Sequence, residues 1–102
     1  MKKKPKTFQE AANIIWAECL DLMCRKQNDY GPDNILDLGE KGVFVRTYDK
    51  LKRLKRIVWE GRKIKVSDEK TVDTWRDTAN YAIIALMVKR GWFGLPLKED
   101  LK

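Results

Sequence analysis

The chain has 102 residues and a mass of 12.0 kDa, enough for one domain near the lower size limit of a self-sufficient core. It contains no histidine, so a histidine general base, a Ser-His or Cys-His pair and a His-containing zinc site are all excluded. The formal net charge is +7, and residues 46–65 account for all of it, with nine basic side chains against Asp49 and Glu60. Such a segment indicates a negatively charged partner, for example phosphate groups.

Two cysteines, Cys19 and Cys24, are spaced so that they lie on different sides of a predicted helix. No signal-peptide core and no apolar run of membrane-spanning length precedes them. We therefore expect reduced thiols, a cytoplasmic location and no membrane partner.

The first predicted helix spans residues 8–27. It begins at a capping box, in which Thr7 is the N-cap and Glu10 reaches back. Residues 28–32, Asn-Asp-Tyr-Gly-Pro, are a strong stop signal. The lysine-rich residues 1–6 predict a basic, disordered tail before the helix. The apolar stripe of the helix comprises Phe8, Ala12, Ile15, Cys19 and Leu22.

A connection of about fourteen residues, ending at Gly42, is predicted between the first and second helices, and loops of this length in small domains are often functional. The second helix is predicted over residues 43–60, with a glycine after its end. One of its sides is apolar and consists of Phe44, Tyr48, Leu51, Leu54 and Val58. The neighbouring row is basic and consists of Arg46, Lys50 and Arg53.

The third helix is predicted from an N-cap at Ser67 to Arg90, again with a glycine after its end. Residues 79–88 are apolar almost all round, which predicts that this helix is the central and most buried one. The chain shows no internal repeat and no convincing strand. The predicted fold is therefore all-α, with three main helices in a small bundle; it forms one domain over residues 7–92, followed by a C-terminal tail at residues 93–102.

Aromatic residues are numerous for such a short chain, with four tryptophans, three phenylalanines and three tyrosines. A domain of this size has a small core, and the third helix is already apolar on most sides. We therefore expect part of this apolar surface to lie between the subunits of a homo-oligomer, which would complete the bundle.

The most informative polar pattern lies on the third helix. At about 100° per residue, four polar residues fall on one narrow strip that continues into Ile84 and Met87. They are Glu69, Asp73, Asp77 and Asn80. Because the strip ends in apolar side chains, its carboxylates should face protein and lie close together. Grouped buried carboxylates repel one another unless a cation joins them, and the candidates are Mg²⁺, Mn²⁺ and the basic side chains of the preceding segment.

The helix dipole offers an alternative explanation for Glu69, which would sit in the first turn, where negative charge is favourable whatever the function. Asp73 and Asp77 lie deeper in the helix, between apolar neighbours, where the dipole explains them less well. We therefore interpret these two residues as members of a site.

Three segments together resemble the family called nucleotide modification associated domain 1, a small domain of phages and bacteria. They are KQNDYG (residues 26–31), RTYDKLKRL (46–54) and EKTVDTWRDTANYAI (69–83). The resemblance extends from the first helix to Arg90. It implies nucleotide binding and a role in nucleotide metabolism or modification.

The helical arrangement is also similar to that of the all-α nucleotide pyrophosphohydrolases of the MazG and dimeric dUTPase type. Those enzymes hold Mg²⁺ between two acidic motifs, usually Glu-Glu-x-x-Glu on one helix and Glu-x-x-Asp on the next. Glu69, Asp73 and Asp77 offer a counterpart of the second motif. The first motif is missing, which weakens the case for hydrolysis, because the first helix has only Glu10, Glu18 and Asp21.

In the enzymatic hypothesis, the protein is a Mg²⁺-dependent nucleoside triphosphate pyrophosphohydrolase, and Glu69, Asp73 and Asp77 carry the catalysis. Together with Asp49 they hold one or two Mg²⁺ ions that bind the triphosphate and orient an attacking water. The basic row neutralises the charge that develops on the phosphate. Asp29 and Tyr30 close over the nucleotide, and Trp75 or Tyr81 stacks on the base.

In the alternative hypothesis, the basic row and Asn80 hold a nucleotide or a cyclic oligonucleotide without any chemistry. The acids then only orient Lys50 and Arg53 through ion pairs. Such a protein acts as a sponge for a nucleotide signal or as a modulator of a nucleotide-modifying enzyme. Nonspecific binding of DNA or RNA through residues 46–65 is less favoured, because no recognised nucleic-acid motif surrounds the charge.

Overall fold

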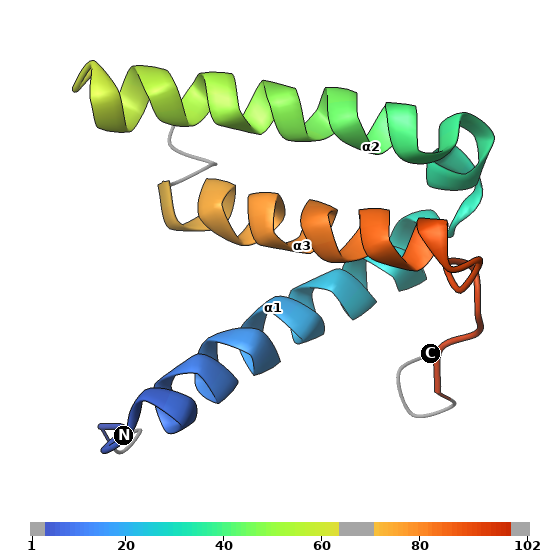
Figure 1. The fold of residues 1–102 in the computed structure, drawn as a ribbon, viewed down its shortest axis with the longest axis horizontal. Coiled ribbons are helices and arrows are strands. Elements are labelled where there is room, and N and C mark those ends of the chain that lie inside the picture. Colours follow the sequence, from blue (N-terminus) through green and yellow to red (C-terminus); the bar gives the residue numbers. More distant parts are fainter. Residues whose placement is uncertain (1–3, 64–70, 99–102) are drawn as a thin grey trace.

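The structure is a computed structural model of the chain, and it describes residues 4–63 and 71–98. These ranges hold α1 (Phe8–Tyr30), α2 (Asp33–Leu54), a short π-helical segment η1 (Lys55–Trp59) and α3 (Thr71–Lys89), and they contain no strand. The predicted all-α fold with three main helices is therefore confirmed. Figure 1 shows α2 and α3 side by side along much of their length, while α1 is inclined to α3 and meets it toward the C-terminal end of α1.

The start of α1 follows its capping signal. The backbone N–H of Glu10 donates to Oγ1 of Thr7 at 3.1 Å, and the carboxylate of Glu10 accepts from the backbone N–H of Lys6 at 2.8 Å. The helix ends at Gly31, whose φ of 70° suits glycine and whose N–H donates to the carbonyl of Gln27 at 2.8 Å. The stop signal thus acts at its glycine and proline, and α1 continues to Tyr30.

The prediction of a long loop before the second helix is wrong. The residues from Asp33 onward are helical, and the only break inside α2 is at Gly39, with φ 62° and ψ −149°. Pro32 has no N–H to leave unpaired at a helix start, and Asp33 in the first turn is favourable for the helix dipole. The same residues that indicate a loop in the sequence therefore start a short helical stretch, and Gly39 then redirects the chain into the long part of α2.

The described part of α3 begins at Thr71, so the predicted N-cap at Ser67 lies outside the described residues. The C-terminal end of α3 is capped at Gly91, as predicted. The N–H of Gly91 donates to the carbonyl of Val88 at 3.1 Å, and the N–H of Trp92 donates to that of Met87 at 2.9 Å.

The apolar core lies between α2, α3 and the segment after α3. Its buried members are Val43, Ile84 and Phe93, and the partly buried side chains packed against them are Met23, Ile35, Tyr81, Ala85, Met87 and Val88. Phe93 is only 8% exposed although the predicted domain ended at Trp92. The packed structure therefore continues into the residues that were predicted to be a C-terminal tail.

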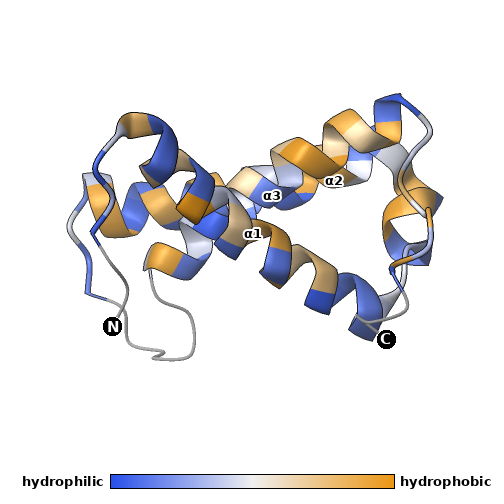
Figure 2. Cartoon of the chain, turned by 90° about the horizontal axis from the view of Figure 1, so that it is seen from below, coloured by the Kyte–Doolittle hydropathy of each residue, from blue (hydrophilic) through white to orange (hydrophobic). Residues whose placement is uncertain are grey.

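Several predicted inner faces point outward instead. The buried residues of α3 are Thr74, Asp77, Asn80 and Ile84, whereas Trp75 is 53% and Leu86 is 60% exposed. On α2, the predicted apolar side is exposed except at Leu54. Val43, which was not part of that predicted side, is buried. As predicted, α3 contacts both other helices and has the most buried residues of the three, but it packs through its polar row and leaves apolar side chains exposed. Hydrophobic residues occur along all three helices (Figure 2). No helix in the described ranges combines the length and the apolar character needed to cross a membrane.

Candidate ligand site

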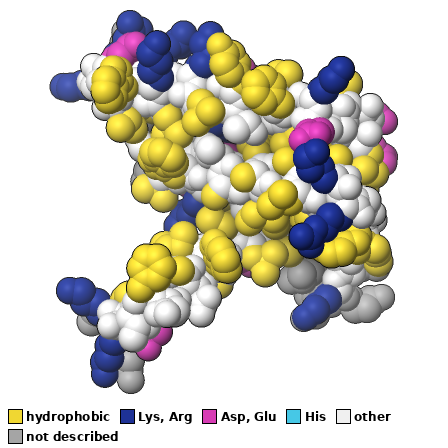
Figure 3. Space-filling view, in the orientation of Figure 1, with side chains coloured by type: hydrophobic (Ala, Val, Ile, Leu, Met, Phe, Trp, Pro, Cys, Tyr) yellow, Lys and Arg dark blue, Asp and Glu magenta, His cyan; other side chains and the backbone are white. Residues whose placement is uncertain are grey.

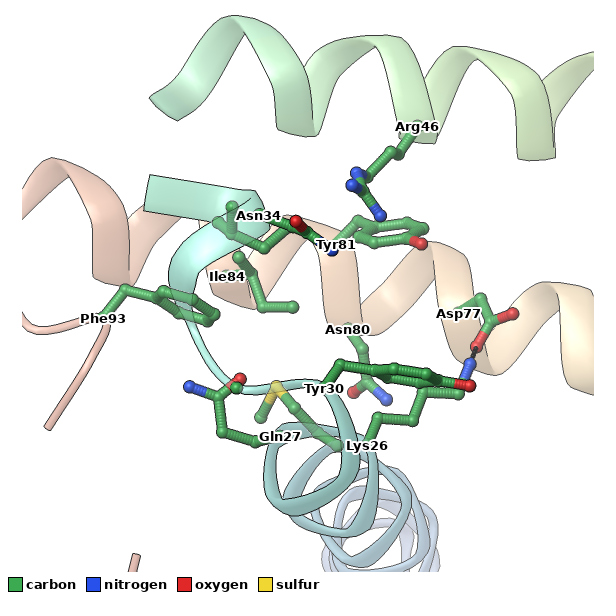
Figure 4. A pocket seen from close by; sticks show the side chains of 13 residues that line it. Lys26, Gln27, Tyr30, Asn34, Arg46, Asp77, Asn80, Tyr81, Ile84 and Phe93 are labelled. Atoms are coloured by element: carbon green, nitrogen blue, oxygen red, sulfur yellow. Dashed lines mark hydrogen bonds and ion pairs between the residues drawn. The ribbon is translucent and has the colours of Figure 1, made fainter. Parts of the chain in front are cut away.

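One carboxylate connects all three helices. Asp77 on α3 is 8% exposed, its Oδ1 accepts a hydrogen bond from Nζ of Lys26 on α1 at 2.8 Å, and its Oδ2 pairs with Nζ of Lys50 on α2 at 3.1 Å. Figure 4 shows Lys26 extending from α1 to this carboxylate. A lone buried carboxylate is costly, and two ammonium groups offset that cost. The predicted association of Asp77 with Lys50 is therefore present in the structure.

Asn80, one turn further along α3, has one satisfied and one unsatisfied polar atom. Its Nδ2 donates to the backbone carbonyl of Cys19 at 3.0 Å, which fixes the orientation of the amide because a carbonyl can only accept. Its Oδ1 is buried, and no residue in the described ranges donates to it. Since an unsatisfied buried acceptor is unfavourable, this atom is suited to receive a hydrogen bond from a bound molecule.

Asp77 and Asn80 lie on the wall of a cavity of about 290 Å³. Figure 4 shows Tyr81 and Arg46 on one side of it and Tyr30, Lys26 and Gln27 on the other. The remaining lining residues are Met23, Gly31, Asn34, Ile35, Ile84 and Phe93. An apolar and aromatic lining with a few polar groups is typical of small-molecule sites, whose volumes start at about 300 Å³.

A second, more open hollow adjoins this cavity. It has a volume of about 330 Å³ and is lined by Arg46, Asp49, Lys50, Arg53 and Tyr81. Arg46 and Tyr81 line both spaces, so the two are neighbours. The predicted basic row of α2 thus lies along one hollow beside the cavity.

Arg46 differs from the two lysines in its electrostatic surroundings. Lys26 and Lys50 share the carboxylate of Asp77, whereas Arg46 makes no ion pair with any residue of the described ranges. Its side chain lines both spaces. A guanidinium without a carboxylate partner is well suited to an anionic ligand, because it offers several donors in a fixed plane.

Other predicted site residues lie elsewhere. The side chain of Asp73 is 45% exposed and is 3.7 Å from Arg76, which in turn pairs with Glu18 on α1 at 2.7 Å. Asp29 is exposed and Trp75 is half-exposed, and neither lines the cavity or the hollow. The structure therefore does not bring Asp73, Asp29 and Trp75 to the cavity or the hollow. Glu69 lies outside the described residues.

The predicted magnesium site does not fit the residues that the structure describes. These residues form no group of three acidic, cysteine or histidine side chains. Both oxygens of Asp77 are taken by lysines, Asp49 lies among basic residues, and Asp73 faces Arg76. Mg²⁺ needs several oxygen ligands in near-octahedral geometry, and these three carboxylates do not come together to supply them.

The sequence interpretation missed several lining residues, among them Lys26, Gln27, Asn34 and Phe93. A signal for Lys26 was available, because it precedes Tyr30 by one helical turn and therefore lies on the same face of α1. Phe93 had no comparable signal, since it follows the end of α3. No family model, curated protein or solved structure matches the chain, so the resemblance to nucleotide modification associated domain 1 stays a prediction.

Proposed function

We propose that the protein binds a single nucleotide and retains it intact. The nucleoside occupies the cavity between the three helices, and the phosphates lie against the basic hollow of α2. The observation that carries this proposal is the junction of the two spaces at Arg46 and Tyr81. A molecule with an aromatic end and an anionic end matches this arrangement.

The cavity suits a nucleoside for two reasons. Tyr30 and Tyr81 supply aromatic rings on opposite sides of it (Figure 4), and stacking of a base on an aromatic ring contributes about 1–3 kcal/mol. The unsatisfied Oδ1 of Asn80 supplies an acceptor for an N–H or O–H group of a base or sugar.

The hollow suits phosphate. Arg46, Lys50 and Arg53 line it together, and charge-assisted hydrogen bonds to phosphate are among the strong ones in proteins. These side chains line an open hollow beside one nucleoside-sized cavity, and the pairing of one cavity with one basic hollow matches a mononucleotide or a cyclic nucleotide.

Binding without chemistry is favoured because Asp77, the buried carboxylate of this site, pairs with basic side chains. Asp77 holds Lys26 and Lys50 in place, which is the role of the acids in the sponge or modulator hypothesis. The pyrophosphohydrolase hypothesis depends on Glu69, which lies outside the described residues, and on a Mg²⁺ ion that the described carboxylates do not fit.

The proposal is tested with a panel of nucleoside triphosphates, monophosphates and cyclic dinucleotides, each with Mg²⁺ and with EDTA. After rapid desalting, mass spectrometry identifies any retained molecule, while a coupled assay follows pyrophosphate release. We expect stoichiometric retention of an intact nucleotide in EDTA. Pyrophosphate release that requires Mg²⁺ would support the enzyme instead, and failure to retain any member of the panel would refute nucleotide binding.

A further inference from the structure

An apolar notch lies between α1 and α3, outside the ligand cavity. It has a volume of about 240 Å³ and is lined by Trp16, Ala17, Leu20, Met23 and Ile83. Trp16 is 69% and Leu20 is 54% exposed. We call this surface the α1–α3 notch. Exposed apolar side chains grouped in a concave surface mark a site for another macromolecule.

The chain is less compact than a self-sufficient monomer of its size. Its radius of gyration is 15.3 Å, whereas about 13 Å is typical for 102 residues. Its accessible surface is 8610 Å², whereas about 6,000 Å² is typical for a compact protein of 12.0 kDa. This difference is well above the roughly 800 Å² that each partner contributes to a standard interface.

The first half of α1 is the most exposed helical segment beside the notch. Phe8 is 85% and Ile15 is 55% exposed, although both belong to the predicted apolar stripe. Figure 3 shows the first part of α1 standing apart from the rest of the molecule, with hydrophobic side chains on both sides of the gap. An isolated helical segment gains little stability from its own sequence and normally depends on packing of an apolar face. The same chain therefore offers an apolar notch and an apolar helix without a partner among the described residues.

Charge distinguishes this surface from the exposed apolar side of α2. Residues 7–24 contain no lysine or arginine and three acids, Glu10, Glu18 and Asp21. Residues 46–56 contain six basic side chains and only Asp49 as an acid, and Lys52 lies over the ring of Tyr48 at 5.5 Å. Two copies that met through α2 would bring these basic segments together, whereas two copies that meet through α1 keep them apart.

We propose that two copies of this chain pair through the α1–α3 notch, with the first half of α1 of each copy packed into the notch of the other. In a two-fold dimer, the notch and the first half of α1 of each copy are both buried against the other copy, because the two contacts are equivalent. The second copy is the partner because the notch and the helix that fills it belong to one sequence.

Sedimentation of the full-length protein at micromolar concentration and physiological salt tests this directly. We expect twice the chain mass of 12.0 kDa. A mass of one chain over the whole concentration range would overturn the proposal.

A pair of matched variants locates the interface. Trp16→Glu/Leu20→Glu places charges in the notch, and Phe44→Glu/Leu51→Glu places them on α2, where the exposed fractions, 67% and 49%, are close to those of Trp16 and Leu20. We expect the first variant to be monomeric and the second to stay dimeric, with helical circular dichroism retained in both. The reverse result would move the interface to α2 and overturn the proposal.

A milder pair covers the case in which the charged notch variant fails to fold. Leu20→Ala removes apolar surface from the notch, and Leu51→Ala removes the same groups from α2. We expect Leu20→Ala to raise the dimer dissociation constant about tenfold, which corresponds to part of the free energy of burying a leucine. Equal dissociation constants for the two alanine variants would refute the notch as the interface.

Discussion

The two faces of α3 have opposite characters. The face toward α1 and α2 is mainly polar, and its residues Thr74, Asp77, Asn80 and Ile84 are at most 8% exposed. The outward face is apolar, and its residues Val72, Trp75, Ile83 and Leu86 are 56%, 53%, 36% and 60% exposed. A soluble helix normally buries its apolar stripe and exposes its polar one.

This difference separates two roles within one helix. The inward polar residues are expensive to bury, and they are retained where they join the helices and line the cavity. The outward apolar residues contribute little to the stability of one chain and are available for contacts with another. Substitutions on the two faces should therefore have very different effects.

Asp77→Ala should have the largest effect on stability. It leaves the two ammonium groups of Lys26 and Lys50 without their shared carboxylate, and breaking a buried ion pair costs about 3 kcal/mol. Urea unfolding followed by circular dichroism measures the change. Asp73→Ala is the control, because its carboxylate is 45% exposed and should contribute less than about 1 kcal/mol. Equal losses of unfolding free energy for the two variants would show that Asp77 has no special role in stability.

Asn80→Ala should have the next largest effect, about 2 kcal/mol, because it removes the buried hydrogen bond from Nδ2 to the carbonyl of Cys19. Thr78→Ala is a suitable comparison on the same helix, since its hydroxyl donates locally to the carbonyl of Thr74 at 2.7 Å and connects no other element. We expect less than about 1 kcal/mol for that change. An unchanged unfolding midpoint for Asn80→Ala would show that this bond does not hold α1 on α3.

Removing the ion pair of Glu18 with Arg76 should have a smaller effect on the free energy of unfolding. Both side chains are about one third exposed, at 28% and 34%, so the pair should contribute roughly 0.5–1 kcal/mol. A double-mutant cycle with Glu18→Gln and Arg76→Met isolates this coupling. Because salt screens partly exposed charges, the coupling should shrink at high salt. A coupling energy that stays constant with salt would indicate a more buried pair.

Leu86→Ala, on the outward face, should have the smallest effect on the free energy of unfolding, within about 0.5 kcal/mol. The same chemical unfolding measurement applies, compared with Ile84→Ala two residues earlier, which should cost about 3 kcal/mol as a buried aliphatic truncation. A loss of similar size at Leu86 would mean that the outward face is covered in solution.

Much of the fold follows from local signals in the sequence. Thr7 and Gly31 mark the ends of α1, and Gly91 marks the end of α3, because caps depend on nearby residues. The start of α2 could not be predicted in this way, since proline and aspartate favour loops and helix N-termini alike. Whether an apolar stripe faces inward depends on the other helices, and periodicity contains no information about them.

The site was predictable where residues share a helix face. Asp77 and Asn80 on α3, and the basic row on α2, were identified from spacing, and they line neighbouring spaces. The partner of Asp77 on α1, Lys26, depends on how α1 crosses α3, which is a tertiary property. The separation of Asp73 from Asp77 has a similar cause, because a shift of one helical turn relative to the crossing helices decides which carboxylate is buried.

The proposed site is tested most directly by the Arg46→Met variant. Its affinity is measured for the nucleotide of the panel that binds the unmodified protein most tightly. Arg56→Met is the matched control, since it removes the same charge from an exposed position in η1 that lines neither space. Isothermal titration calorimetry in EDTA should show affinity at least about tenfold weaker for Arg46→Met, a change of about 1.4 kcal/mol, and little change for Arg56→Met. Equal affinities for both variants would show that only net charge matters, which would contradict a nucleotide site at the junction of the cavity and the basic hollow.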